Sequence, residues 1–72
     1  MDIRMRIGMR IKELRQGLKL TQEQLAFRAE LDKTYVNEIE RGKRNVAIIN
    51  LEKIIKALDT TIQRFFNTKD FN

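Results

Sequence analysis

The chain is 72 residues long and contains neither cysteine nor histidine, which excludes disulfide bridges, Cys/His zinc sites and thiol or imidazole catalysis. At this length it forms at most one small domain, residues 1–72, for which we expect no enzymatic activity, no cofactor and no metal. The formal net charge is +5, of which residues 1–44 contribute +4, so nucleic acid or anionic lipid is a candidate partner and simple solubility is the alternative.

Membrane insertion is not expected. The longest uninterrupted apolar run, Val46–Ile49, is far shorter than the roughly 20 residues that cross a bilayer. The N-terminus alternates arginines with apolar residues and lacks the continuous apolar stretch of a secretory signal. We therefore expect a cytoplasmic protein.

The N-terminal segment has one apolar stripe at helical spacing, which predicts a helix over about Asp2–Gly17. The stripe consists of Ile3, Ile7, Ile11, Leu14 and Leu18. Gly8 is expected to weaken this helix slightly. Met5 and Met9 fall on the opposite side, so we place them at the surface or against another chain.

Two short helices follow. Thr21 and Gln24 have the spacing of a capping box, which predicts a second helix of about nine residues with Leu25, Ala26 and Ala29 facing inward. Asp32 caps a third helix that ends at Arg41 and Gly42, with an inward face formed by Val36 and Ile39. Two short helices joined by three residues are typical of a helix-turn-helix.

A fourth helix stops near Asp59 and has a stripe of Ile48, Leu51, Ile54, Ile55 and Leu58. Thr61 then caps a last helix of one to two turns that contains Ile62, Phe65 and Phe66, after which Phe71 and its neighbours are expected to fray. No segment alternates with period two, so we predict an all-α protein of five helices.

The residues from Ile7 to Asn45 read IGMRIKELRQGLKLTQEQLAFRAELDKTYVNEIERGKRN and resemble the helix-turn-helix of phage Cro and repressor proteins, the XRE family. LEKIIKAL and TTIQRFF look like the fourth and fifth helices of that family. The resemblance implies a compact lambda-repressor-like fold. LDKTYVNEIERGKRN and the small size look most like controller proteins of restriction–modification systems, which implies a dimeric transcription regulator that first activates and later represses.

The third helix has a polar face opposite its apolar one. A major groove about 12 Å wide admits one such helix, whose side chains then reach base edges. Lys33 can donate to guanine, Thr34 can contact a thymine methyl, and Asn37 can pair with adenine, whereas Glu38 suits only a cytosine donor. A solvated helix face explains this helix alone equally well.

Two further features favour DNA binding. Gln22 stands in the first turn of the second helix, where side chain and free N–H groups can meet a phosphate, as the resemblance also implies. A basic loop that can hold the DNA backbone follows the third helix and consists of Arg41, Lys43, Arg44 and Asn45. Such loops are more often merely solvated. The resemblance singles out Arg44, and it implies a DNA contact for Tyr35, whose alternative is the core.

The resemblance also implies an orienting ion pair between Arg15 and Glu40, which otherwise are independent surface charges. Glu30 departs from the family pattern, because it occupies a turn position where glycine is common. It requires a left-handed backbone there or a differently shaped turn. Ala47 and Val46 replace a usual Ser or Thr cap and a common proline.

Ile49 lies beside the stripe of the fourth helix and is expected to be exposed. With Phe65 and Phe66 it can form the self-complementary patch of a twofold dimer, the helix near residues 61–67 contributing. The two phenylalanines can instead close the core, and we expect one to face inward and one across the dimer axis. Phe27 is expected to be an exposed aromatic without assigned function.

The expected partner is double-stranded DNA with a pseudo-palindromic operator, whose half-site centres lie about 34–36 Å apart for a dimer. RNA polymerase is considered as a further contact, and the expected location is the nucleoid in the cytoplasm. Alternatives are another XRE-type repressor such as a phage repressor or antitoxin, and a helical protein-interaction module. A peripheral membrane peptide fits least, because the core requires the apolar stripe.

Overall fold

A computed structural model describes residues 1–71 and contains in them five α-helices and one 3-10 helix. They are α1 (Ile3–Gly17), α2 (Gln22–Ala29), α3 (Lys33–Glu40), α4 (Ile48–Ala57), α5 (Ile62–Phe66) and η1 (Lys69–Phe71). Residues 1–71 contain no strand, and the predicted all-α fold is confirmed. None of the helices in this range is long and apolar enough to span a membrane.

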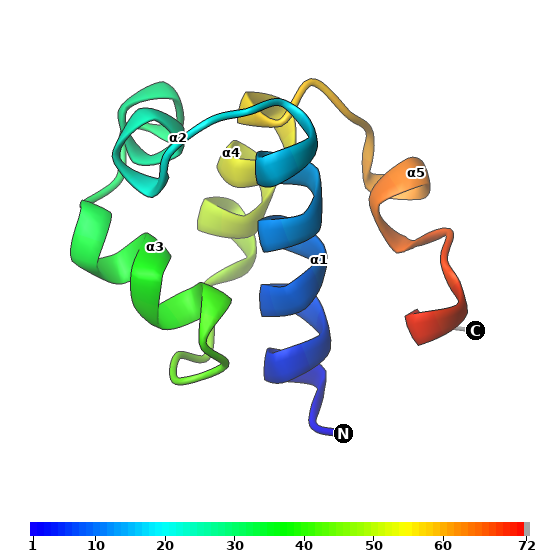
Figure 1. Cartoon of the computed structure of the whole chain (residues 1–72). Coiled ribbons are helices and arrows are strands. Elements are labelled where there is room, and N and C mark those ends of the chain that lie inside the picture. Colours follow the sequence, from blue (N-terminus) through cyan, green and yellow to red (C-terminus); the bar gives the residue numbers. More distant parts are fainter. Residues whose placement is uncertain (72) are drawn as a thin grey trace.

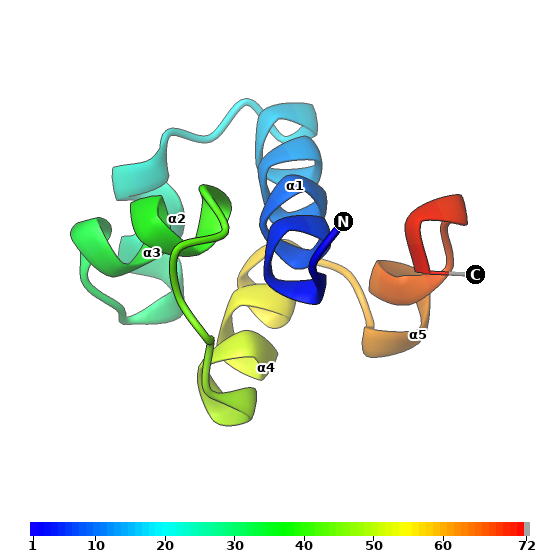
Figure 2. The same ribbon diagram turned by 90° about the horizontal axis from the view of Figure 1, so that it is seen from below.

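Helix α1 lies between the helix-turn-helix and the C-terminal segment. Figure 1 shows α2 and α3 on one side of α1 and α5 on the other, and Figure 2 shows the same arrangement from below. Helix α1 packs on α3, α2 packs on both α3 and α4, and α4 packs on α5. The N-terminal helix therefore supports the third helix directly.

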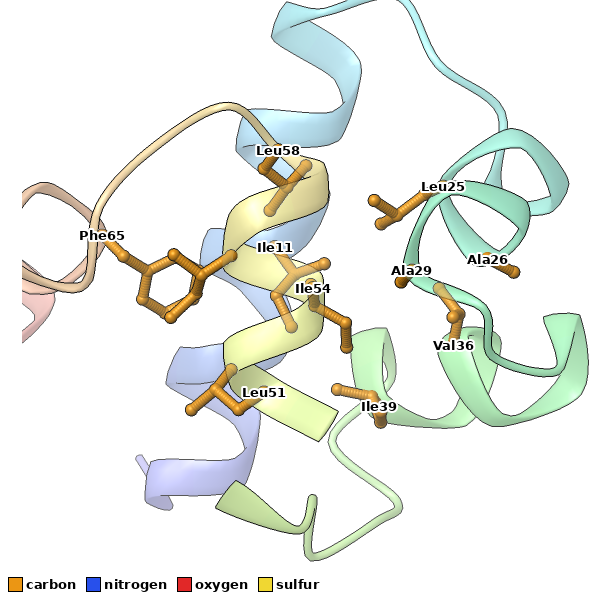
Figure 3. Close-up of a cluster of buried hydrophobic side chains, with 11 residues drawn as sticks. Ile11, Leu25, Ala26, Ala29, Val36, Ile39, Leu51, Ile54, Leu58 and Phe65 are labelled. Carbon is orange, nitrogen blue, oxygen red and sulfur yellow. The ribbon is translucent and has the colours of Figure 1, made fainter. Parts of the chain in front are cut away.

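One hydrophobic core joins the five helices (Figure 3). It is formed by Ile11, Leu25, Ala26, Ala29, Val36, Ile39, Leu51, Ile54, Ile55, Leu58 and Phe65. Full burial of a large aliphatic or aromatic side chain contributes about 1.5–3 kcal/mol to the hydrophobic stabilisation. The inward faces predicted for the second and third helices are confirmed.

Two predicted stripes are shorter than expected. Of the stripe predicted for α1 only Ile11 is fully buried, whereas Ile3 and Leu18 at its ends are exposed. In α4 the buried stripe begins at Leu51, and the prediction that Ile48 belongs to it is wrong, because this side chain is 83% exposed. Figure 2 shows the reason, since the first turn of α4 extends beyond the neighbouring helices.

Gly8 permits the close packing of α1 on α3. A Cβ atom added at this glycine would clash with the carbonyl oxygen of Ile39 and would lie 2.8 Å from that of Glu40. From the sequence Gly8 was expected only to weaken the helix slightly, because the approaching backbone belongs to a segment about 30 residues away. Glycine here lets two helix backbones approach each other.

The turn of the helix-turn-helix has a left-handed residue. Glu30 caps α2 with φ 57° and ψ 43°, which is the first of the two conformations predicted for it. The N–H of Leu31 returns to the carbonyl oxygen of Ala26 at 2.9 Å, and the Asp32 carboxylate accepts from the N–H of Thr34 at 2.9 Å. These bonds fix the entry of the chain into α3 despite a steric cost of about 1–2 kcal/mol at Glu30.

The C-terminal segment is attached to α1 by two arginines. Arg10 donates to the carbonyl oxygens of Phe65 at 2.8 Å and Arg64 at 2.9 Å, which lie at the end of α5. Arg6 donates to the carbonyl oxygen of Asp70 at 3.1 Å. The expected fraying of Phe71 is not seen, because its ring packs against Phe66 and Phe65. Residue 72, expected to fray with it, lies outside the described residues.

Candidate nucleic-acid interface

The outer face of α3 is polar and open to solvent. Lys33 and Thr34 are exposed in the first turn, and Asn37 and Glu38 are half-buried one turn later. Val36 and Ile39 hold the opposite side of the helix in the core. Figure 1 shows α3 at the left edge of the molecule, with α2 above it and α1 and α4 on its right. The four side chains predicted to reach bases are therefore brought to one accessible face.

Gln22 begins α2 as predicted, and the capping box before it is present. Thr21 Oγ1 accepts from the N–H of Gln24 at 3.0 Å, and Gln24 Oε1 accepts from the N–H of Thr21 at 2.8 Å. Within residues 1–71 the backbone N–H groups of Gln22 and Glu23 have no partner. The two residues line a hollow of about 480 Å³ together with Arg15, Thr21 and Lys33.

The Gln22 side chain lies between α2 and α3. Its Nε2 donates to Glu40 Oε1 at 3.1 Å, and its Oε1 accepts from Asn37 Nδ2 at 3.1 Å. Gln22 and Asn37 were both predicted to contact DNA, but the bond between them was not predicted. Two polar residues in different helices give no local signal that they meet.

The expected pairing of Arg15 with Glu40 is confirmed. Arg15 Nε lies 2.7 Å from Glu40 Oε2, its Nη2 lies 2.9 Å from Glu40 Oε1, and its Nη1 donates to the carbonyl oxygen of Leu20 at 2.8 Å. The Glu40 side chain is only 2% exposed. Such a buried pair adds little net stability, but loss of one partner costs about 3–5 kcal/mol because the other charge is stranded. It holds α1 and α3 in one orientation.

The loop after α3 is exposed, and one of its cations is held against α3. Arg41, Lys43 and Asn45 are exposed, while Gly42 adopts φ 72°. Arg44 Nε lies 3.6 Å from Glu38 Oε1, and its guanidinium lies 4.8 Å from the centroid of the Tyr35 ring. The position of Arg44 in this loop was predicted, but its contacts with Glu38 and Tyr35 on α3 were not.

Tyr35 links α3 to the start of α4. Its ring is half-buried, and its hydroxyl oxygen accepts from Asn50 Nδ2 at 3.1 Å and from the N–H of Ala47 at 3.4 Å. Ala47 is the N-cap of α4 and has no polar side chain to satisfy the first N–H groups. The Tyr35 hydroxyl supplies part of that missing cap. The absence of a capping residue was visible in the sequence, but the side chain that replaces it was not.

The predicted dimer surface is partly rearranged. Ile49 is 67% exposed, as expected, and Phe66 is half-buried. Phe65 is fully buried and its ring points from α5 into the core (Figure 3), so it is the phenylalanine expected to face inward, and its assignment to the dimer surface is wrong. Ile62 and Ile48 are exposed beside Ile49, and sequence analysis missed both. They share a hollow of about 290 Å³ lined by Ile48, Ile49, Leu51, Glu52, Ile55 and Ile62.

Comparison with known proteins identifies the family. Residues 11–65 match the model of the helix-turn-helix family. The control protein C.MunI of Mycoplasma sp is 45% identical over 67 residues, which cover 92% of this chain and 90% of that protein. The control protein C.BamHI of Bacillus amyloliquefaciens is 45% identical over 58 residues, which cover 79% of this chain and 72% of that protein.

Solved structures agree with these relatives. The restriction–modification controller protein C.AhdI from Aeromonas hydrophila superposes with a TM-score of 0.84 at 43% identity, over 88% of this chain and 96% of that one. The tetramer of the controller protein C.Esp1396I, in complex with its natural 35 base-pair operator, gives a TM-score of 0.84 at 40% identity, over 88% and 83% of the two chains. The chain therefore belongs to the XRE-type helix-turn-helix family and, within it, to the restriction–modification controller proteins.

Proposed function

We propose that this protein is a sequence-specific DNA-binding regulator that controls the transcription of restriction–modification genes as a homodimer. The observation that supports this most directly is the open polar face of α3, which is fixed from behind by the core and by the Arg15–Glu40 pair. A rigid exposed helix with polar side chains in its first turns matches the dimensions of a major groove. Its relatives include a controller protein in complex with its operator.

Base edges are read by the α3 side chains. Lys33 and Thr34 are placed to enter the groove first, because they stand in the first turn of α3 and are exposed. Asn37 follows one turn later and pairs with adenine, whose N6 and N7 present a donor and an acceptor. Glu38 accepts from cytosine or keeps Arg44 in place.

Phosphates are bound on both sides of α3. The free N–H groups of Gln22 and Glu23, with the Lys33 ammonium across the same hollow, suit a phosphate oxygen. On the other side the DNA backbone meets the basic loop, and the contacts come from Arg41, Lys43, Arg44 and Asn45. Tyr35 is half-buried, lies under Arg44 and contacts the same backbone. These contacts position α3 and make the affinity dependent on salt.

The second subunit binds at the apolar hollow of α4 and α5. Ile49 and Ile62 are exposed large aliphatic residues on one surface, and Ile48 extends it. Phe66 packs against the Phe65 ring at the end of α5 and does not line this hollow. A twofold axis through such a patch brings the same residues of two chains together. The resulting dimer has two α3 helices, which requires a pseudo-palindromic operator.

The protein acts where its operator lies, at the nucleoid in the cytoplasm, and contacts RNA polymerase when it activates. It catalyses no reaction.

The decisive experiment is in vitro selection from random duplexes, followed by footprinting of the enriched site. We expect a pseudo-palindrome with half-site centres about 34–36 Å apart. Enrichment of no sequence at low ionic strength would reject the proposed function.

A further inference from the structure

Four polar side chains from three helices form one continuous series of hydrogen bonds that ends at the outer face of α3. Arg15 of α1 donates to Glu40 of α3 at 2.7 and 2.9 Å. Glu40 Oε1 accepts from Gln22 Nε2 at 3.1 Å, and Gln22 Oε1 accepts from Asn37 Nδ2 at 3.1 Å. The series starts at a buried ion pair and reaches a side chain that lies on the proposed base-reading face.

The buried ion pair gives this series one direction. A carboxylate paired with a guanidinium only accepts hydrogen bonds, so Gln22 must turn its Nε2 toward Glu40. The Gln22 oxygen then faces Asn37, which can only donate to it from Nδ2. The two ends of an amide have nearly the same shape, and hydrogen-bond partners alone decide its orientation. The orientation of the Asn37 amide is thus determined by the Glu40 charge.

Asn37 therefore presents a defined pattern to the groove. One Nδ2 hydrogen is used by Gln22, which leaves Oδ1 and the second hydrogen for a base. Adenine offers a donor at N6 and an acceptor at N7, which match this pattern. Guanine offers acceptors at both O6 and N7, one of which would face the Asn37 oxygen.

We propose that Gln22 and Glu40 are positioning residues that make Asn37 prefer adenine over guanine by fixing the orientation of its amide. This inference rests on the proposed function, in which α3 reads bases. It assigns to Gln22 a role separate from any phosphate contact, because its second Nε2 hydrogen remains available for a phosphate. Without Gln22 the Asn37 amide can turn around and offer its NH₂ group to guanine.

The test uses Gln22→Met, which keeps the length of the side chain, removes both bonds and leaves Arg15 and Glu40 paired. Asn37→Ala first identifies the base pair that Asn37 reads, as the position whose preference it removes in selection. The wild-type protein is then titrated with the selected operator containing adenine or guanine at that position. A well-made bidentate contact discriminates by roughly 5- to 150-fold. We expect Gln22→Met to reduce this ratio at least fivefold.

The matched control is Gln16→Met, because Gln16 is exposed on α1 and its side chain forms no hydrogen bond within residues 1–71. It should leave the ratio unchanged. Thermal unfolding of each variant establishes that it is folded. Glu40→Gln is the second test variant. An amide at this position can bond Gln22 in either orientation, so this variant should also weaken the preference for adenine over guanine at the same base pair.

The outcomes separate the inference from the function on which it rests. A wild-type protein that selects no sequence rejects the proposed function and the inference together. A selective wild-type protein whose Gln22→Met variant loses affinity equally for adenine and guanine shows that Gln22 contacts phosphate only, and overturns the inference alone. If Gln22→Met loses base preference at a base pair other than the one identified by Asn37→Ala, the inference is overturned as well.

Discussion

The Arg44 guanidinium lies over the Tyr35 ring, 4.8 Å from its centroid, and Arg44 Nε lies 3.6 Å from the Glu38 carboxylate. In the free protein this cation is therefore turned toward α3. Both members of the ion pair are partly exposed, so the pair itself contributes only about 0–1 kcal/mol to stability. Its main effect is to hold the Arg44 cation against α3 before DNA binds.

Glu38→Gln should strengthen binding to DNA. The substitution releases Arg44 and removes a negative charge from a surface that approaches phosphates. We expect operator affinity to rise several-fold at constant salt, because Arg44 no longer has to leave the Glu38 carboxylate before it meets a phosphate. Titrations at several salt concentrations measure this affinity. Glu13→Gln, which removes the 2.7 Å pair with Arg10 on α1, is the control. An unchanged affinity would show that the pair with Glu38 does not hold Arg44 back from DNA.

Arg44→Glu should weaken specific binding. Charge reversal removes one phosphate contact and introduces repulsion, for which we expect a loss of about 1–3 kcal/mol at constant salt. Lys56→Glu is the matched control, because Lys56 is exposed at the end of α4. Fluorescence anisotropy with the selected operator measures the loss. Equal affinities of the two variants would remove Arg44 from the interface.

Tyr35→Phe should destabilise the fold. The variant leaves the ring in place but deprives Asn50 and the Ala47 N–H of their acceptor, which costs about 1 kcal/mol. Urea unfolding measures this change in the free energy of unfolding. In the Tyr35→Phe background Asn50→Ala should cost less than in the wild type, since the shared bond is already absent. Additive losses would contradict a direct interaction between the two side chains.

Gly8→Ala should lower the stability of the fold, whereas Gly17→Ala should not. A methyl group at Gly8 meets the α3 carbonyl oxygens, so overpacking should cost about 1–3 kcal/mol. At Gly17 the same methyl group would meet no atom of residues 1–71 within 4 Å, and the higher helix propensity of alanine should leave stability unchanged or raise it. Thermal unfolding compares the pair. Equal melting temperatures would show that α1 and α3 can separate without cost.

Ile49→Asp should yield a monomer. An aspartate in the apolar hollow must be desolvated on association, which opposes burial of the surface. Phe27→Asp is the control, because Phe27 is 84% exposed on α2 and lies outside that hollow. Sedimentation equilibrium at micromolar concentration gives the mass of each variant. If Ile49→Asp remains dimeric, or if Phe27→Asp dissociates, the second subunit binds elsewhere.

The elements that could be predicted from the sequence are those encoded by neighbouring residues. Thr21, Asp32 and Thr61 cap helices at the predicted positions, because a capping side chain bonds backbone only two or three residues away. Helical spacing also identified the inward faces of α2 and α3. The whole topology, by contrast, followed from the resemblance to a known family.

The features that could not be predicted depend on a partner distant in the chain. Gly8 is needed because of the backbone at Ile39 and Glu40, and no residue near Gly8 reveals this approach. Tyr35 bonds a residue 15 positions later, and Gln22 meets Asn37 from another helix. In each case residue type was compatible with several roles, and only the packing of helices selects one.

The bonds from Arg10 to the end of α5 have a consequence for operator architecture. They attach the C-terminal segment to α1, and α1 in turn contacts α3 through Gly8 and Arg15. In a dimer joined through α4 and α5, the distance between the two α3 helices is therefore set by the packing of α5, α1 and α3 within each subunit. Grafting a different segment 61–71 would alter the number of base pairs between half-sites while the bases recognised in each half-site stay the same.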